Sequence, residues 1–104
     1  MVVFWSPNAR GILRSIFDYY LEVASRKVAV NMTGKIRMTA HALGAMPYMG
    51  LPEKELPGYR SIIENRIFKI IYRVDEVKEF VEIVSIFDCR RDPAKIRENV
   101  PEKS

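Results

Sequence analysis

Hydrophobic and polar residues alternate along much of the stretch from Gly58 to Asp92. The alternation runs from Tyr59 to Glu64 and again from Ile67 to Val74, and both runs are rich in β-branched and aromatic residues. A period of two is typical of a strand with two unlike faces. A third run, Phe80 to Phe87, is apolar at most positions, which is typical of a strand covered on both faces. We therefore predict a meander of three antiparallel strands.

A different spacing precedes the meander. After a short β-prone run from Val2 to Trp5, the pair Ser6-Pro7 combines a capping side chain with the residue suited to the first helical position. We predict a strand followed by a long helix, with Arg14 and Asp18 one turn apart on its polar side, where they can pair. The apolar residues recur at steps of three and one, which places them along one side of that helix. They are Ala9, Ile12, Leu13, Ile16, Phe17, Tyr20, Leu21 and Ala24.

A second helix is expected after Ser25, another capping residue, and it ends at Gly44. Gly34 costs that helix about 1 kcal/mol relative to alanine, and we interpret it as a close approach of the two helices. The stretch Ala45 to Pro57 has no periodicity, so we predict an ordered loop that leads to the far edge of the sheet. The apolar side of the second helix is formed by Ala29, Met32, Ile36, Ala40 and Leu43.

These elements predict an α+β fold: an N-terminal strand, a helical hairpin and then the three-strand meander, with the helices packed on one face of the sheet. The length suits one domain over residues 1–104. The pair Asp92-Pro93 predicts a short helix toward Asn99, and we expect residues 99–104 to fray. For the last strand we predict that another protein supplies the second cover.

The register of the meander decides where its cations lie. Arg60 and Lys69 belong to the more charged set of positions on the first two strands. The more charged positions of the two strands face the same side only if the turn around Asn65 holds an even number of residues. A slip of one residue would move all the side chains of one strand to the opposite face. On that register we expect Arg60 and Lys69 to be cross-strand neighbours on the face turned away from the helices.

Composition narrows the class of protein. Hydrophobic residues make up 48% of the chain and charged residues 29%, which is the balance of a soluble globular protein. No apolar run is long enough to span a bilayer, so we predict a cytoplasmic location without membrane contact. Cys89 is the only cysteine, which excludes an internal disulfide and a cysteine-based zinc site. The net charge of +4 mildly favours an acidic or polyanionic partner.

The order of these pieces resembles a known family. A strand and a helical hairpin are followed by the loop PYMGLPEKELPGYR, the hairpin YRSIIENRIFKIIYRVD and the ending FDCRRDP. This arrangement, over nearly the whole chain, is similar to the RelE/ParE superfamily of bacterial toxins. The most specific pieces are Gly58-Tyr59-Arg60, Ile67 to Tyr72 and Arg90-Arg91-Asp92.

The resemblance implies the toxin of a type II toxin–antitoxin pair. In this superfamily a cognate antitoxin wraps the toxin with an extended C-terminal segment, and its other end often binds operator DNA. Operator DNA is therefore expected to be reached only through the antitoxin. RelE-like members cut messenger RNA in the ribosomal decoding site, whereas ParE-like members block DNA gyrase.

RNA cleavage by attack of the 2′-hydroxyl needs a proton acceptor, cations around the phosphate and an acid for the leaving oxygen. If the chain is RelE-like, the resemblance assigns the cationic roles to Arg60, Lys69, Arg90 and Arg91. The sequence departs from that pattern at Ile62, where a second strand lysine is expected, and at Asp88, where many relatives carry histidine.

No tyrosine or histidine follows Phe87, so proton transfer has no obvious agent. The first hypothesis is therefore a ParE-like toxin that binds a topoisomerase without chemistry of its own. The alternatives are a ribosome-dependent endoribonuclease and a non-toxic member that acts only within an antitoxin complex.

The remaining candidates are few. We predict antitoxin contacts at Phe80, Val84 and Ile86, because the last strand has an apolar excess. No cofactor or metal is expected, since no phosphate loop, dinucleotide fingerprint or metal-ligand spacing occurs. We interpret His41 as a packing or solvent-facing residue. Two arginines follow Cys89 and can lower the pKa of its thiol, but no histidine is near it in sequence, which argues against a catalytic thiol.

Overall fold

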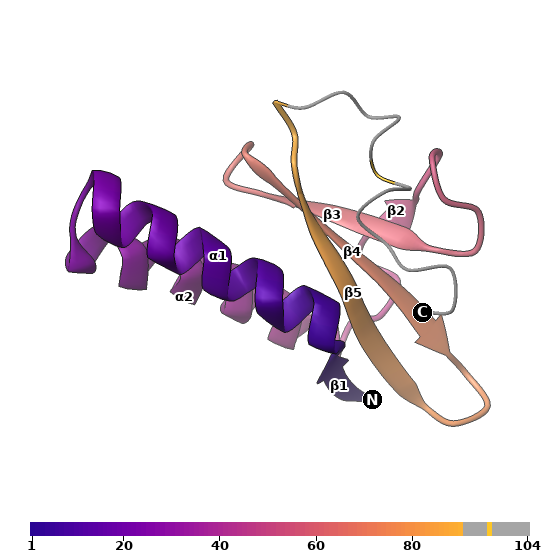
Figure 1. Cartoon of the computed structure of the whole chain (residues 1–104). Helices are drawn as coiled ribbons and strands as arrows, with labels where there is room; N and C mark the ends of the chain where they lie inside the picture. Colours follow the sequence, from indigo (N-terminus) through magenta and orange to yellow (C-terminus); the bar gives the residue numbers. More distant parts are fainter. Residues whose placement is uncertain (91–95, 97–104) are drawn as a thin grey trace.

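Figure 1 shows a computed structural model of the chain, which describes residues 1–90 and Ile96. A helical hairpin lies against a twisted sheet and projects beyond it. The elements are β1 (Val2–Trp5), α1 (Pro7–Val23), α2 (Arg26–Ala42), β2 (Leu51–Pro52), β3 (Arg60–Glu64), β4 (Phe68–Asp75) and β5 (Phe80–Asp88). The predicted α+β architecture is confirmed.

The sheet has the strand order β1-β5-β4-β3-β2. The meander β3-β4-β5 is antiparallel, as predicted, and β1 joins it in parallel beside β5, with Val2 opposite Phe80. The loop before the meander adds β2 at the far edge, where Leu51 pairs with Ser61. The sheet is therefore mixed and has five strands among the described residues, which are the predicted N-terminal strand, the predicted meander and the additional strand β2.

Both helices start at the capping residues that the sequence indicates. The Ser6 Oγ accepts a hydrogen bond from the Ala9 N–H at 3.0 Å, and the Ser25 Oγ accepts one from the Val28 N–H at 3.1 Å. A capping side chain satisfies one of the donors that a helix leaves unpaired at its first turn. Arg14 pairs with Asp18 at 3.1 Å on the exposed side of α1. Neither helix is long and apolar enough to cross a membrane.

The helices cover one face of the sheet and form the main core with it. Apolar residues of α1 and α2 pack there against residues of β4 and β5. The opposite face holds a smaller cluster in which Ile71, Val84 and Phe87 are buried together with Ile96. The fully buried or nearly buried members of the main core are Ala9, Leu13, Ile36, Ala40, Leu43, Phe68, Ile70, Tyr72, Val81, Ile83 and Ile86.

Two details differ from the sequence-based expectations. The second cover of β5 comes from this chain itself, since Leu56 and Tyr59 pack with Ile96 over its outer face. Gly34 does not mark a close approach, because a Cβ built there meets no atom within 4 Å. The predicted short helix from Asp92 to Asn99 and the predicted frayed tail at 99–104 lie outside the described residues, apart from Ile96.

The loop between α2 and β3 is fastened to the core by one buried hydroxyl. The Tyr72 side chain is fully buried, its hydroxyl donates to the Pro47 carbonyl at 2.8 Å, and it accepts from the Gly50 N–H at 3.0 Å. A buried tyrosine needs such partners, because an unpaired hydroxyl in the core is costly. Gly50 allows this contact, since a Cβ there would lie 2.5 Å from the Ser61 carbonyl oxygen and 2.7 Å from the Tyr72 hydroxyl.

Replacement of Gly50 by alanine is therefore expected to destabilise the protein. The new methyl group would collide with backbone and with a buried ring, and overpacking of this kind costs about 1–3 kcal/mol. The free energy of unfolding in urea measures the effect.

Gly34→Ala is the matched control. Its new methyl group meets open space in the middle of α2, so we expect stabilisation by about 0.5–1 kcal/mol. Equal effects of the two substitutions would contradict the close approach at Gly50.

Candidate functional site

Arg60 lies on the helix-facing side of the sheet. It pairs with Tyr72 across β3 and β4, and Tyr72 belongs to the core beneath the helices. The Arg60 guanidinium donates two hydrogen bonds to the Gly50 carbonyl, from Nη2 at 2.8 Å and from Nε at 3.2 Å, and stands 5.1 Å from the centre of the Tyr48 ring. Arg60 thus holds the loop that precedes it.

Lys69 lies on the opposite side. Its Nζ donates to Glu53 Oε1 at 2.8 Å, and the Glu53 side chain is only 2% exposed. The same carboxylate accepts from the Ser61 hydroxyl at 3.0 Å and from the Glu55 N–H at 2.8 Å. Glu53 was not singled out from the sequence, because an acidic residue in a proline-rich loop gives no sign of burial.

The environment of Glu53 lowers the pKa of its carboxyl group. Burial by itself raises that pKa, but the hydrogen bonds from Lys69, the Glu55 N–H and Ser61 favour the ionised form and prevail. The Glu53 carboxyl group is therefore ionised at neutral pH, and its ion pair with Lys69 fastens the loop to the outer face of β4.

The expectation that Arg60 and Lys69 are neighbours on one face is wrong. The register pairs Glu64 with Phe68 and Arg60 with Tyr72, so the turn encloses 65–67, an odd number of residues. Asn65 and Arg66 adopt positive φ angles of 53° and 60°, which lets this tight turn close. Because side chains alternate between faces, Arg60 and Lys69 point to opposite sides of the sheet.

Arg90 follows β5 and lies on the helix-facing side at the end of the sheet. Its guanidinium donates two hydrogen bonds to Asp88, from Nη2 to Oδ2 at 2.6 Å and from Nε to Oδ1 at 2.9 Å. The backbone N–H of Arg90 donates to the same carboxylate. The hydrogen bond to Asp88 and the charge of Asp88 raise the pKa of Arg90. The fourth predicted cation, Arg91, lies outside the described residues.

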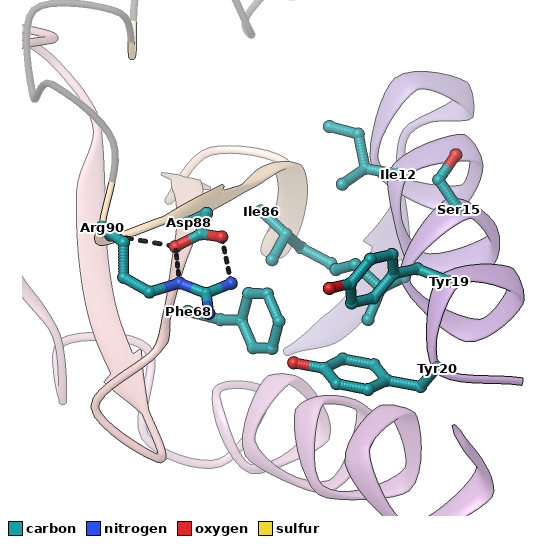
Figure 2. A pocket seen from close by; sticks show the side chains of 9 residues that line it. Ile12, Ser15, Tyr19, Tyr20, Phe68, Ile86, Asp88 and Arg90 are labelled. Carbon is teal, nitrogen blue, oxygen red and sulfur yellow. Dashed lines mark hydrogen bonds and ion pairs between the residues drawn. The ribbon is translucent and has the colours of Figure 1, made fainter. Parts of the chain in front are cut away.

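Arg90 stands at the rim of a cleft of about 480 Å³ between α1 and the ends of β4 and β5. Figure 2 shows Tyr19 and Tyr20 reaching from α1 toward Phe68, with the Arg90–Asp88 pair on the other side of the cleft. The walls are mostly apolar. The lining residues are Ile12, Ser15, Ile16, Tyr19, Tyr20, Phe68, Ile86, Asp88 and Arg90.

The described cations do not converge on this cleft. Lys69 faces the other side of the sheet. Arg60 of β3 lies opposite Tyr72 of β4. Asp88 lies opposite Phe68, which is four residues from Tyr72 on β4, and its strand β5 flanks β4 on the side away from β3. At about 3.3 Å per residue and about 4.8 Å per strand, the backbone positions of Arg60 and Asp88 are about 16 Å apart. The Arg60 guanidinium is bound to the Gly50 carbonyl and the Arg90 guanidinium to Asp88, so these two cations are engaged at separate places.

The predicted antitoxin contacts on β5 are mostly inside the protein. Val84 is fully buried in the smaller cluster and Ile86 is 3% exposed in the main core, so both residues pack against their own chain. Phe80 is half-buried and meets Phe4 edge-on, with ring centres 5.2 Å apart. Of the predicted residues, only Phe80 retains exposed surface beside Phe4, which is 51% exposed.

The remaining residues considered in the sequence are Cys89 and His41. Burial raises the pKa of the Cys89 thiol, with a smaller opposing effect of Lys69, so a lowering by the neighbouring arginines does not prevail. His41 is exposed near the end of α2, which agrees with the sequence-based interpretation. Within residues 1–90 and Ile96 no cluster of histidine, cysteine and carboxylate side chains suits a metal ion.

Comparison with known proteins identifies the family. Residues 3–93 match the family described as the ParE toxin of the type II toxin–antitoxin system, parDE. The chain belongs to the ParE toxin family. This match spans both helices and all the strands from β3 to β5. No curated protein matches the sequence of this ParE-family chain.

Solved structures show the same fold. The chromosomal ParDE system of P. aeruginosa is 24% identical, with a TM-score of 0.74 over 85% of this chain and 95% of the other. The toxin–antitoxin complex RelBE2 of Mycobacterium tuberculosis is 20% identical, with a TM-score of 0.64 over 84% and 95%. The YoeB/ParE toxin of Agrobacterium tumefaciens is 17% identical, with a TM-score of 0.57 over 85% and 98%. The RelE/ParE resemblance is confirmed, and with it the ParE-like branch.

The Glu53–Lys69 pair predicts a pH dependence of stability. Because the pKa of Glu53 is lower in the folded state, its contribution is present above the unfolded pKa of about 4.3 and is lost as the pH falls through the folded value. Glu53→Gln should therefore remove part of the loss of unfolding free energy between about pH 5 and pH 3.

Lys69→Met tests the same pair at neutral pH. It leaves the Glu53 carboxylate buried without its cation, which costs about 3 kcal/mol. Urea unfolding measures both variants. A Lys69→Met protein as stable as the wild type would contradict a buried ion pair.

Proposed function

We propose that this ParE-family chain arrests growth by binding DNA gyrase, with no chemistry of its own, and that a cognate antitoxin silences it. The observation that carries the proposal is the separation of the cations: Arg60 and Lys69 occupy opposite faces, and each is bound to the loop beside it. RNA cleavage without a metal needs cations that surround one phosphate. The arrangement favours a toxin that acts through its surface.

The cleft beside α1 is the part of that surface suited to the target. Apolar walls, two tyrosines and an arginine at the mouth are the residue types that dominate the energetics of protein interfaces. The Arg90 guanidinium is already neutralised in part by Asp88, so it suits a hydrogen-bonded partner at the rim better than a phosphate.

Two neighbours support an antitoxin as the second partner. The structure from Mycobacterium tuberculosis is a toxin–antitoxin complex, and a structure from Staphylococcus aureus is a heterotetrameric YoeB-YefM complex with a TM-score of 0.51 to this chain. Both share the fold of this chain. We infer that the antitoxin encoded beside this toxin binds it and masks the surface that meets gyrase, inside the cytoplasm.

A pair of assays on the purified protein tests the target. We expect it to inhibit supercoiling by gyrase and to leave messenger RNA intact on programmed ribosomes. Cleaved messenger RNA with undisturbed supercoiling would reject the proposal in favour of a ribosome-dependent endoribonuclease. A chain that is inert in both assays would indicate a member that acts only within an antitoxin complex.

Arg90→Ala is expected to raise the concentration needed for half-inhibition of supercoiling by about tenfold, because arginines at the rim of an aromatic cleft often anchor a partner. Lys78→Ala is the control, since Lys78 is exposed at the turn before β5 and away from the cleft. Dose-response curves for both variants give the comparison. An unchanged Arg90→Ala curve would remove the cleft from the target surface.

A further inference from the structure

The helical hairpin holds the entire charge excess of the chain. Residues 7 to 42 contain six cationic and two acidic residues, so their net charge of +4 equals that of the whole protein. Cations and carboxylates balance in the rest of the sequence. A charge excess on one element draws an anionic partner to that element. The cations of the hairpin are Arg10, Arg14, Arg26, Lys27, Lys35 and Arg37.

Four of these residues, all arginines, lie along one side of the hairpin. Arg14 on α1 and Arg37 on α2 border the same groove between the helices, and no strand residue lines that groove. Arg10 lies about one turn before Arg14, and Arg26 lies about three turns before Arg37, so helical periodicity places each pair on one side of its helix. All four are exposed. We call Arg10, Arg14, Arg26 and Arg37 the arginine band.

The length of the arginine band suits a continuous row of negative charges. At about 1.5 Å per residue, Arg26 and Arg37 are about 16 Å apart along α2. Packed helices lie about 8–10 Å apart, so the arginines of α1 form a second row beside the first. Duplex DNA carries one negative charge per about 1.7 Å of its axis. Several phosphates of a duplex therefore pass along the band at once.

The arginines of the band are available to a partner. Among residues 1–90 and Ile96, the ion pairs engage only Arg14 of the four. Arg14 pairs with Asp18, but the two side chains are 77% and 56% exposed, and so exposed a pair contributes little to stability. A phosphate can take the place of that carboxylate, because a guanidinium binds both groups with paired hydrogen bonds.

The proposed function supplies a source of phosphates. Gyrase acts on duplex DNA, so a toxin bound to the working enzyme has a polyanion beside it. Contacts to phosphates position a protein on a duplex but carry no sequence information. Exposed arginines on the outside of two packed helices suit contacts of this kind. The projection of the hairpin beyond the strands (Figure 1) lets a duplex approach it without meeting the sheet.

We propose that the arginine band binds the phosphate backbone of duplex DNA without reading its sequence, and that this duplex is the DNA held by gyrase. The second half rests on the proposed function, and the first half does not. The cleft shares no lining residue with the groove that the band borders, so it can contact the enzyme at the same time. Two simultaneous contacts strengthen the binding of DNA-loaded gyrase.

A labelled duplex of random sequence tests the first half on the full-length protein. Fluorescence anisotropy at several salt concentrations measures the affinity and its salt dependence. We expect Arg26→Gln/Arg37→Gln to bind about tenfold or more weakly at about 50 mM salt, and the slope of log affinity against log salt to fall by about two. Glutamine is a strong helix former, and circular dichroism confirms folding.

Lys54→Gln/Lys78→Gln is the matched control, with the same change in net charge at exposed residues outside the hairpin. We expect its affinity to stay within about twofold of wild type. Failure of wild type to bind the duplex, or an equal loss in the two double variants, would overturn the inference. So would unchanged binding by Arg26→Gln/Arg37→Gln. An RNA duplex of the same length that binds about tenfold more tightly than DNA would overturn the assignment to DNA.

Purified gyrase with and without a bound duplex tests the second half. Wild type should bind the loaded enzyme about threefold or more tightly than the empty enzyme at low salt. Arg26→Gln/Arg37→Gln should bind both forms equally, with the affinity that wild type has for empty gyrase. Weaker binding of this variant to empty gyrase would place the arginines on the enzyme and overturn the second half.

The same titrations separate this inference from the proposed function. Equal affinity of wild type for the loaded and empty enzyme would overturn the DNA contact within the complex and leave gyrase as the target. If wild type binds neither form, the proposed function fails together with the second half. The anisotropy measurement then decides the first half by itself.

Discussion

The turn between β3 and β4 decides which side of the sheet each functional side chain faces. Three residues, 65–67, separate the paired Glu64 and Phe68, and positive φ angles at Asn65 and Arg66 allow that short connection. Strand side chains alternate with a period of two, so one residue more or fewer would exchange the two faces of β3 relative to β4. With the observed turn, Phe68, Ile70 and Tyr72 all point toward the helices and complete the core.

The same register explains how the loop after α2 is held from both sides of the sheet. Tyr72 reaches Pro47 and Gly50 on the helix-facing side, while Lys69 reaches Glu53 on the outer side. Arg60 adds a guanidinium bridge to the Gly50 carbonyl. The two strand cations that RNA cleavage would need are thereby engaged in fastening a loop, and this engagement supports the proposed binding function.

The helical hairpin contributes two separate concave surfaces. One side of α1 faces the ends of β4 and β5 across the cleft with its tyrosines, and another side faces α2 across a groove of about 250 Å³ bordered by Arg14 and Arg37. The proposed function, in which the chain contacts a target and a silencing protein, would use such adjoining surfaces.

Local patterns were sufficient to predict both helices, their capping serines and the antiparallel meander, because caps and periodicity act within a few residues. The order of these pieces along the chain gave the resemblance to the RelE/ParE superfamily. They did not predict the parallel pairing of β1 with β5 or the short strand β2, since contacts between distant segments leave no local signal. The odd number of residues in the turn between β3 and β4 placed Arg60 and Lys69 on opposite faces of the sheet. Burial of Val84, Ile86 and Glu53 likewise depends on which segments come to cover them, and only the tertiary structure settles that.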